Sequence, residues 1–125
     1  MSEEPIRRVE KDRRPAPAEW FEGRVEMEPV LEVADPVLRQ NRVHFHDGGH
    51  TRWHLHMGDQ VLYFVEGHGM AEDADGNHLL CEPGDIVHVP VNTRHRHGAA
   101  PGSDAVHIAV TNGETIWDVD PRYPG

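Results

Sequence analysis

Short runs of alternating apolar and polar residues, separated by turn-forming residues, occupy most of the chain after Trp20. The runs lie at 24–33, 40–46, 60–66, 78–82, 85–90 and 104–111. Segments rich in glycine, proline, aspartate and asparagine lie between them, at 47–49, 73–77, 82–85, 100–104 and 111–114. Alternation with a period of two is typical of strands with one buried face, and no window of helical length keeps a helical period without a glycine or proline. The sequence therefore predicts an all-β sandwich or barrel.

The chain has 125 residues, which is enough for one domain with a buried core. Residues 1–19 mix prolines with arginine and lysine, bury little by themselves, and predict an N-terminal arm. Residues 20–112 predict the barrel and residues 113–125 a C-terminal tail, in which Trp117 and Tyr123 could pack as an edge strand or against a neighbouring subunit. Within the barrel, Asp75-Gly76 predicts a hairpin closed by a type I′ turn.

Charge and composition argue against several classes of partner. The net charge is -10 with histidines neutral, whereas nucleic acids are bound by clusters of lysine and arginine. Cys81 is the single cysteine and cannot form a disulfide within the chain. No segment approaches the roughly 18 apolar residues of a membrane span. We therefore expect a cytoplasmic protein that binds a small molecule, with neither a nucleic-acid nor a membrane partner.

Histidine is unusually frequent, with 11 residues, and three pairs are separated by one residue: His44/His46, His54/His56 and His95/His97. Residues i and i+2 of a strand point to the same face, so each pair could converge on one metal ion. His44 and His46 alternate with Val43 and Phe45, so they face outward if the apolar residues face the core.

The second pair has neighbours that favour a metal site. After His56, residues 57–59 form a short turn and Gln60 begins the next predicted strand, which brings its amide oxygen back beside the pair. His95 comes from a distant segment, as is usual when a barrel assembles a site from several strands. We therefore predict that the metal ligands are His54, His56, Gln60 and His95.

These residues resemble the two sequence motifs of the cupin superfamily. In the first motif, a glycine, His-x-His, a glutamate and a second glycine correspond to Gly48, His54, His56, Gln60 and Gly67. The second motif corresponds to Gly84, Pro90, Asn92, His95 and Ala99. Gln60 thus replaces a glutamate ligand, and Ala99 replaces a terminal asparagine. Asn92 replaces a turn glycine, and asparagine is the next most tolerant residue there.

The resemblance implies a single jelly-roll β-barrel over most of residues 20–112. Segments 21–30, 51–62 and 95–110 are more narrowly similar to small manganese-binding cupins that include hydroxynitrile lyases, in which glutamine is the usual fourth ligand. Polyketide cyclases and dioxygenases share the likeness more loosely. Small cupins are commonly homodimers in which an N-terminal segment crosses to the partner, so the resemblance implies a homodimer and an arm over 1–19 that is flexible or strand-swapped.

The predicted ligands are three neutral imidazoles and one amide oxygen, so a bound divalent ion would keep its full charge and act as a strong Lewis acid. This donor set suits one divalent transition-metal ion per chain, Mn²⁺ or Fe²⁺ first, with Zn²⁺, Ni²⁺ and Cu²⁺ as alternatives. Four protein ligands leave positions open for water and substrate.

Two further histidines are predicted to be catalytic. His97 lies two residues beyond His95 on the same strand, where it could move a proton or orient a ligand. His107 shares a face with Ala109 and lines the pocket if that face is turned inward; a core or surface position is the alternative, although the cupin resemblance also implies a histidine there. The same periodicity predicts pocket walls formed by Asn41, Val43, Phe45, Leu62, Phe64 and Ala109.

Three functions remain open at this point. The first is a metal-dependent lyase acting on a small carbonyl or hydroxy compound, for which the resemblance implies hydroxynitrile cleavage with a histidine as general acid and base. The second is an iron-dependent dioxygenase or a polyketide cyclase-like enzyme; a carboxylate would stabilise oxidised iron better than Gln60 does. The third is a non-catalytic cupin that binds a ligand and contains a structural metal.

Overall fold

The computed structural model of the protein describes residues 6, 8–34 and 36–118. This part of the chain forms strands and no helix. The strands are β1 (Arg14–Pro15), β2 (Phe21–Ala34), β3 (Val37–Thr51), β4 (His54–His56), β5 (Gln60–Gly67), β6 (Gly69–Asp73), β7 (His78–Cys81), β8 (Ile86–Val89), β9 (His95–Ala99), β10 (Ala105–Asn112) and β11 (Thr115–Trp117). The all-β prediction is confirmed, and no helix among the described residues is long and apolar enough to cross a membrane.

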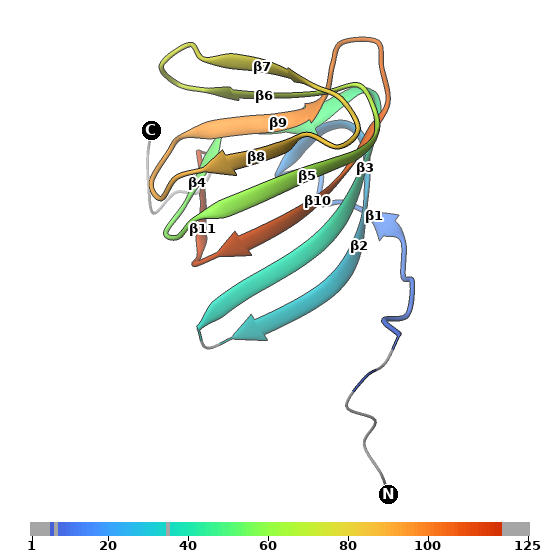
Figure 1. Ribbon diagram of the computed structural model, residues 1–125, viewed down its shortest axis with the longest axis vertical. Coiled ribbons are helices and arrows are strands. Elements are labelled where there is room, and N and C mark those ends of the chain that lie inside the picture. The colour runs from blue at the N-terminus through green and yellow to red at the C-terminus, as the bar shows by residue number, and fades with distance from the viewer. Residues whose placement is uncertain (1–5, 7, 35, 119–125) are drawn as a thin grey trace, which may run out of the picture.

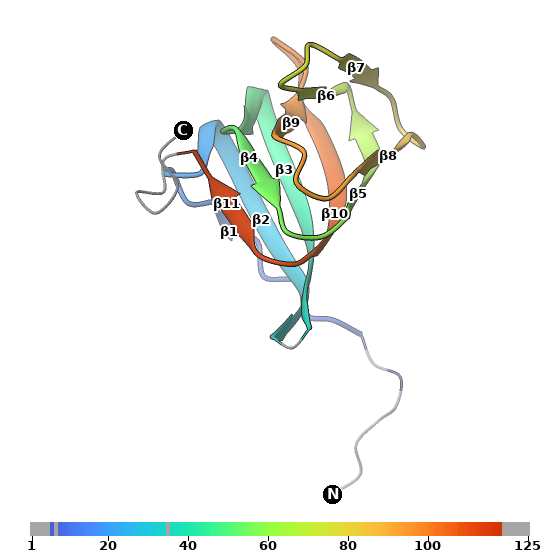
Figure 2. The ribbon, with the colours of Figure 1, turned by 90° about the vertical axis from the view of Figure 1, so that its left-hand side faces the viewer.

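The strands form one curled antiparallel sheet with the order β11-β4-β9-β3-β10-β5-β8. In addition, β2 pairs with β3, and the β6–β7 hairpin pairs with β9 through β6. Figure 1 shows the long β2–β3 hairpin extending to one end of the molecule and the β6–β7 hairpin lying at the other. In Figure 2, the short strands β4 and β11 cross in front of β2 and β3. The inner face of this curled sheet carries the core and the candidate site.

Strand alternation determines which side chains face inward. In β10, Ala105, His107, Ala109 and Thr111 are buried, whereas the residues between them are half-buried or, at the end, exposed. The predicted parity of His107 and Ala109 therefore matches the buried face. The apolar core forms two clusters, one around Phe21, Val25, Val43, Phe45, Ala99 and Ala105, and one around Leu62, Phe64, Ala71, Cys81, Val89 and Ala109.

The turn before β9 is hydrogen-bonded to the end of β4, and so links the strand of His95 to that of His54 and His56. The Thr93 N–H donates to the Pro90 carbonyl at 3.3 Å, and Asn92 has φ +62°, which is the pattern of a type II turn. Asparagine tolerates this left-handed conformation better than most residues. The Asn92 N–H also donates to the His56 carbonyl at 2.9 Å, which anchors the turn to the end of β4.

The hairpin between β6 and β7 forms where Asp75-Gly76 predicts it, but the predicted type I′ turn is wrong. A type I′ turn needs positive φ at both central residues, and here Gly76 has φ +92° whereas Asp75 is not in the left-handed region. The Asp73 side chain accepts the N–H groups of Asp75 and Asn77, and the Gly76 N–H donates to the Asp73 carbonyl. These bonds favour a type I turn followed by a left-handed glycine.

Both terminal segments contribute short strands. Arg14–Pro15 pairs with Glu26 and Met27 of β2 in the same chain. Trp117 lies in the edge strand β11 beside His54, while Tyr123 lies outside the described residues. Strand β6 was not predicted, because glycine and acidic residues interrupt apolar alternation there.

Candidate metal centre

Two adjacent strands, β4 and β9, bring the three predicted histidine ligands together. His54 and His56 alternate with Leu55 on β4, and both rings are buried on the inner face. His95 of β9 lies directly opposite His54 in the sheet register, with ring centroids 4.3 Å apart. The His56 ring lies 4.9 Å from His54 and 5.2 Å from His95, again between centroids. Strands β4 and β9 are far apart in the sequence but adjacent in the sheet at this position.

Hydrogen bonds fix the tautomers of two of these rings. Nδ1 of His54 lies 2.8 Å from the Arg52 carbonyl, and Nδ1 of His95 lies 2.8 Å from the Thr93 carbonyl. A carbonyl oxygen only accepts, so each Nδ1 carries the hydrogen and each neutral ring presents a lone pair on Nε2. A backbone partner of this kind is the usual support of a metal-binding histidine.

Gln60, at the start of β5, presents its amide oxygen to the same cluster. Its Nε2 donates to the Thr111 hydroxyl at 2.9 Å, and its Oε1 lies 3.0 Å from Nε2 of His95. Both of these facing atoms are acceptors when His95 is neutral, so they repel each other unless a cation lies within reach of both. Two neighbouring ligands of an octahedral ion, each about 2.1 Å from it, lie about 3 Å apart. The pair therefore fits a metal ion.

Three ring nitrogens of the site lack a hydrogen-bond partner among the described residues: Nε2 of His56, Nε2 of His97 and Nδ1 of His107. Nε2 of His56 is buried without one, while its Nδ1 lies 2.8 Å from the Thr115 hydroxyl. Nε2 of His97 is also buried without a partner. An unpaired buried imidazole nitrogen costs free energy, and coordination to a metal would satisfy it. The donor set and the unsatisfied Nε2 of His56 thus both fit a divalent transition-metal ion.

The structure also brings His97 close to the predicted ligands. One ring nitrogen from each of His54, His95 and His97 lies within 4.8 Å of the other two. The ring centroid of His97 is 5.4 Å from that of His54 and 5.5 Å from that of His95, farther than the His56 centroid is from either. His97 therefore lies beside the His54, His56 and His95 rings, within reach of a group bound among them.

His97 and His107 form a buried histidine pair. Nδ1 of His97 lies 2.8 Å from Nε2 of His107, and both rings are almost completely buried. One hydrogen must occupy this contact, because two bare ring nitrogens would repel each other. When Nδ1 of His97 donates to His107, Nε2 of His97 presents a lone pair toward the metal-ligand cluster. The pair can then hold or accept a proton beside the site.

Burial keeps these rings neutral near pH 7. It lowers the pKa of His107 to about 4. Burial, with the repulsion that a protonated His95 would exert and the charge of Arg39, lowers the pKa of His56 to about 3. Burial also holds the pKa values of His54 and His97 well below the ordinary value of 6.5, with neighbouring histidines as the second cause. Neutral imidazole is the form that binds a metal or accepts a proton.

A cavity of about 230 Å³ adjoins these groups. Of the predicted ligands and catalytic residues, His54, Gln60, His97 and His107 line it. Of the predicted pocket walls, Asn41, Val43 and Ala109 line it. Phe45, Leu62 and Phe64 are buried in the two core clusters and are not among its lining residues. These three side chains therefore face inward, as predicted, but pack in the core instead of lining the cavity.

Several lining residues were not predicted. Thr111 shares the parity of His107 and Ala109, and Arg39 shares that of Asn41 and Val43, so the alternation that suggested their neighbours could have identified both. Others come from segments near the ends of the barrel, where no sequence pattern connects them to the site: Trp20, Thr115 and Trp117. The two tryptophan rings stack with centroids 4.9 Å apart.

Comparison with known proteins identifies the family of this chain. Residues 41–112 match the family described as Cupin domain. The chain belongs to the cupin family. An (R)-mandelonitrile lyase from Granulicella tundricola is 37% identical to this cupin over 95 residues, which cover 75% of the cupin and 72% of the lyase.

Two other relatives show how broad the family is. An acireductone dioxygenase from Serratia proteamaculans is 38% identical to the cupin over 82 residues, and the match covers 55% of the cupin and 46% of the dioxygenase, less than half its length. The crystal structure of a cupin-like protein from Thermotoga maritima superposes with a TM-score of 0.77 and 27% identity, covering 97% of the cupin and 95% of that chain.

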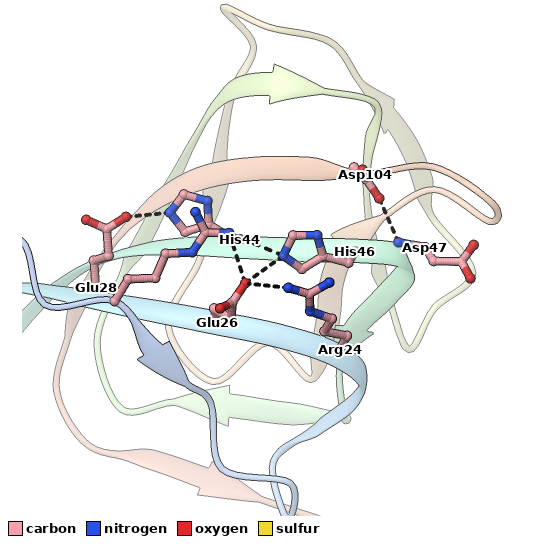
Figure 3. A network of polar contacts seen from close by, with 8 residues as sticks. Arg24, Glu26, Glu28, His44, His46, Asp47 and Asp104 are labelled. Carbon is pink, nitrogen blue, oxygen red and sulfur yellow. Dashed lines mark hydrogen bonds and ion pairs between the residues drawn. The ribbon is translucent and has the colours of Figure 1, made fainter.

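The outer histidine pair of the cupin is separate from the candidate metal centre. Nε2 of His44 lies 2.5 Å from a Glu28 carboxylate oxygen, and Nε2 of His46 lies 2.8 Å from one of Glu26 (Figure 3). Arg24 approaches the same Glu26 oxygen at 3.6 Å. His44 and His46 therefore cross-link β3 to β2. On another surface, His88 lies 2.9 Å from Asp59.

Proposed function

We propose that this cupin is a metal-dependent lyase acting on a small hydroxy or carbonyl compound, and that it cleaves and forms hydroxynitriles. The observation that carries the proposal is the contact between Gln60 and His95 at 3.0 Å, two acceptors facing each other beside the His97–His107 pair. The 37% identity to an (R)-mandelonitrile lyase, over 72% of that protein, supports the choice of reaction.

In this proposal His54, His56, Gln60 and His95 would hold one divalent transition-metal ion, with Mn²⁺ or Fe²⁺ favoured. Bound there, the ion would supply Lewis-acid chemistry toward a substrate oxygen. Unlike a glutamate, the neutral amide of Gln60 adds no charge to the site. The backbone carbonyls of Arg52 and Thr93 and the hydroxyl of Thr111 orient three of the four donors.

His97 is the proposed base, and His107 positions it. In the cleavage direction, Nε2 of His97 accepts the hydroxyl proton of the substrate while His107 accepts the hydrogen bond from Nδ1. The carbon–carbon bond to the nitrile then breaks, its electron pair leaves with cyanide, and the carbonyl forms. The proton on His97 passes to cyanide, so the products are an aldehyde and hydrogen cyanide. No oxidant or reductant is required.

A second candidate is a dioxygenase, which the likeness to an acireductone dioxygenase favours. That match covers less of both proteins than the match to the lyase does. Gln60 also argues against this candidate, because a carboxylate ligand would stabilise oxidised iron better than a neutral amide.

Turnover of mandelonitrile without oxygen tests the proposal. The protein should be loaded with Mn²⁺ in one sample and with Fe²⁺ in another. In anaerobic buffer, benzaldehyde and cyanide should be released in equal amounts. His97→Ala should lose this activity, whereas His88→Ala, which removes an exposed histidine outside the cavity, should keep it. Oxygen uptake with an enolised diketone, without mandelonitrile cleavage, would favour the dioxygenase. Tight binding without either turnover would favour a non-catalytic cupin.

A further inference from the structure

We infer that the substrate of this cupin carries a carboxylate, and that the Arg39 guanidinium recognises it inside the cavity. This inference rests on the proposed function, because it takes the cavity beside the candidate metal centre as the substrate site. It adds a charged group to the substrate class and assigns a residue that determines specificity.

Arg39 occupies the same row of the sheet as Gln60. Thr111 of β10 pairs with Gln60 of β5 on one side and with Arg39 of β3 on the other. Side chains of directly paired residues point to the same face, and neighbouring strands lie about 4.8 Å apart, so the Gln60 and Arg39 backbones lie about 10 Å apart across the inner face. Both side chains line the same cavity. The Arg39 guanidinium donates to the Thr115 hydroxyl, which also lies 2.8 Å from Nδ1 of His56, so the charge lies near the candidate metal centre.

The charge of Arg39 has no acidic partner within the described chain. Its guanidinium donates to the Thr115 hydroxyl at 2.6 Å and to the Gly113 carbonyl at 3.3 Å, and both acceptors are neutral. Glu32 lies opposite Arg39 in the β2–β3 register, but it is exposed and forms no ion pair with it among the described residues. By contrast, other arginines have a carboxylate oxygen within 4.0 Å: Arg13, Arg14, Arg24, Arg42, Arg52, Arg94 and Arg96.

Arg39 is also the one permanently charged side chain that lines this cavity in the described part of the cupin. Among the residues that the structure describes, no aspartate or glutamate lines it, although the whole chain carries a net charge of -10. The remaining walls are apolar or neutral, and include the stacked rings of Trp20 and Trp117. An isolated cation beside apolar walls attracts an anion with an apolar body.

Guanidinium chemistry favours a carboxylate as that anion. The hydrogen bonds to Thr115 and Gly113 both come from one terminal nitrogen, which leaves N–H groups on the other two nitrogens. A planar guanidinium binds a carboxylate through two parallel hydrogen bonds. The substrate class is therefore a small carboxylate that also carries a carbonyl or hydroxyl group on an apolar or aromatic body.

Two probes that differ only in charge test this inference: 4-formylbenzoate and its neutral isostere 4-formylbenzamide. Calorimetric Kd values should be measured with metal-free and Mn²⁺-loaded protein. The natural protein should bind the benzoate about tenfold or more tightly than the benzamide, as expected of a charge-assisted bidentate pair. In Arg39→Gln this preference should fall to about twofold or less, with the affinity for the benzamide unchanged.

Arg42→Gln is the matched control. Arg42 lies on the same strand with the opposite parity and pairs with Glu66 at 3.6 Å, so its removal changes the net charge equally but leaves the cavity intact. The preference should survive in this variant. Arg39→Lys keeps the charge without the planar fork and should lose at least about threefold of the preference. Circular dichroism should show that each variant is folded.

Equal affinity of the natural protein for both probes would overturn the inference, as would failure to bind either. A preference that persists in Arg39→Gln would also overturn it, because the carboxylate would then be bound by the metal ion or another group. These outcomes are measured without turnover. If the preference is present and depends on Arg39 while mandelonitrile is not cleaved, the carboxylate site stands and the proposed lyase reaction fails.

Discussion

The amide oxygen of Gln60 lies 3.0 Å from Nε2 of His95, although neither atom has a hydrogen to share. The Gln60 amide hydrogens point toward Thr111, and the His95 hydrogen is bound to the Thr93 carbonyl. Two lone pairs at this distance are stable beside a cation and unfavourable without one. Two residues 35 positions apart in the sequence are thus placed so that a cation is needed between them.

Metal content should separate ligands from neighbouring histidines. His54→Ala, His56→Ala and Gln60→Ala should each retain less than about a tenth of the metal bound by the natural protein after dialysis, because one donor is lost. His97→Ala should retain its metal, since its ring is proposed to accept a proton. Elemental analysis of purified variants gives the result. Full metal content in His56→Ala together with loss in His97→Ala would replace His56 by His97 in the ligand set.

The Thr111 hydroxyl should control metal affinity through Gln60. Thr111→Val keeps the shape of the side chain but removes the acceptor of the Gln60 amide, so the metal Kd should rise about 10- to 100-fold. Thr111→Ser retains a hydroxyl and should remain within about threefold of the natural protein. Competition with a fluorescent chelator measures both values. Equal affinities for the valine and serine variants would exclude this role.

His97 and His107 should affect rate rather than metal binding. His97→Ala should lower kcat about 100-fold or more, in the range of a lost general base. His107→Leu should also lower kcat, because it removes the acceptor that orients Nδ1 of His97. His107→Gln can supply an amide oxygen in its place and should recover part of the rate. An equal rate for the glutamine and leucine variants would mean that His107 contributes packing alone.

The metal-free protein should lose stability as the pH falls below about 6.5. Folding holds the pKa of His56 at about 3 and that of His107 at about 4, while both bind protons near 6.5 when unfolded. The unfolded state then gains protons that the folded state excludes. The free energy of unfolding should therefore fall by up to about 1.4 kcal/mol per pH unit for each such histidine between pH 6 and 4.

Urea titrations of the metal-free protein at several pH values measure this slope. His107→Gln should reduce the slope by up to about 1.4 kcal/mol per pH unit, the contribution of one proton. His88→Gln, which changes an exposed ring, should leave the slope unchanged. A slope that is the same in His107→Gln as in the natural protein would show that His107 titrates normally in the fold.

Two glycines with similar backbone conformations should differ in their tolerance of alanine. Gly67 has φ +74° and Gly76 has φ +92°, so a Cβ atom strains both positions. At Gly76 the added atom meets nothing within 4 Å, and Gly76→Ala should cost about 1 to 2 kcal/mol. At Gly67 it would lie 2.0 Å from the Asp104 carbonyl oxygen. Gly67→Ala should therefore cost more than about 3 kcal/mol by urea denaturation, and equal costs would contradict the steric argument.

The sequence by itself determined the strands with regular apolar alternation, though not β6, and the faces of their side chains. A period of two in the apolar residues predicts buried faces directly, which is why the inward parity of Gln60, His107 and Ala109 agreed with the structure. Spacing in the cupin motifs selected His54, His56, Gln60 and His95, and all four are buried together. The left-handed Asn92 also followed from the sequence, because few residue types tolerate that conformation.

Only the tertiary structure decided which inward residues line the cavity and which fill the core. Val43 and Phe45 lie on the same strand, face inward and belong to the same core cluster, but only Val43 also lines the cavity. Thr115 and Trp117 joined the site because register and strand order place them there, and those depend on long-range pairing that local periodicity does not encode. Long-range strand pairing also places the Gln60 amide oxygen 3.0 Å from Nε2 of His95, a distance that no local sequence pattern predicts.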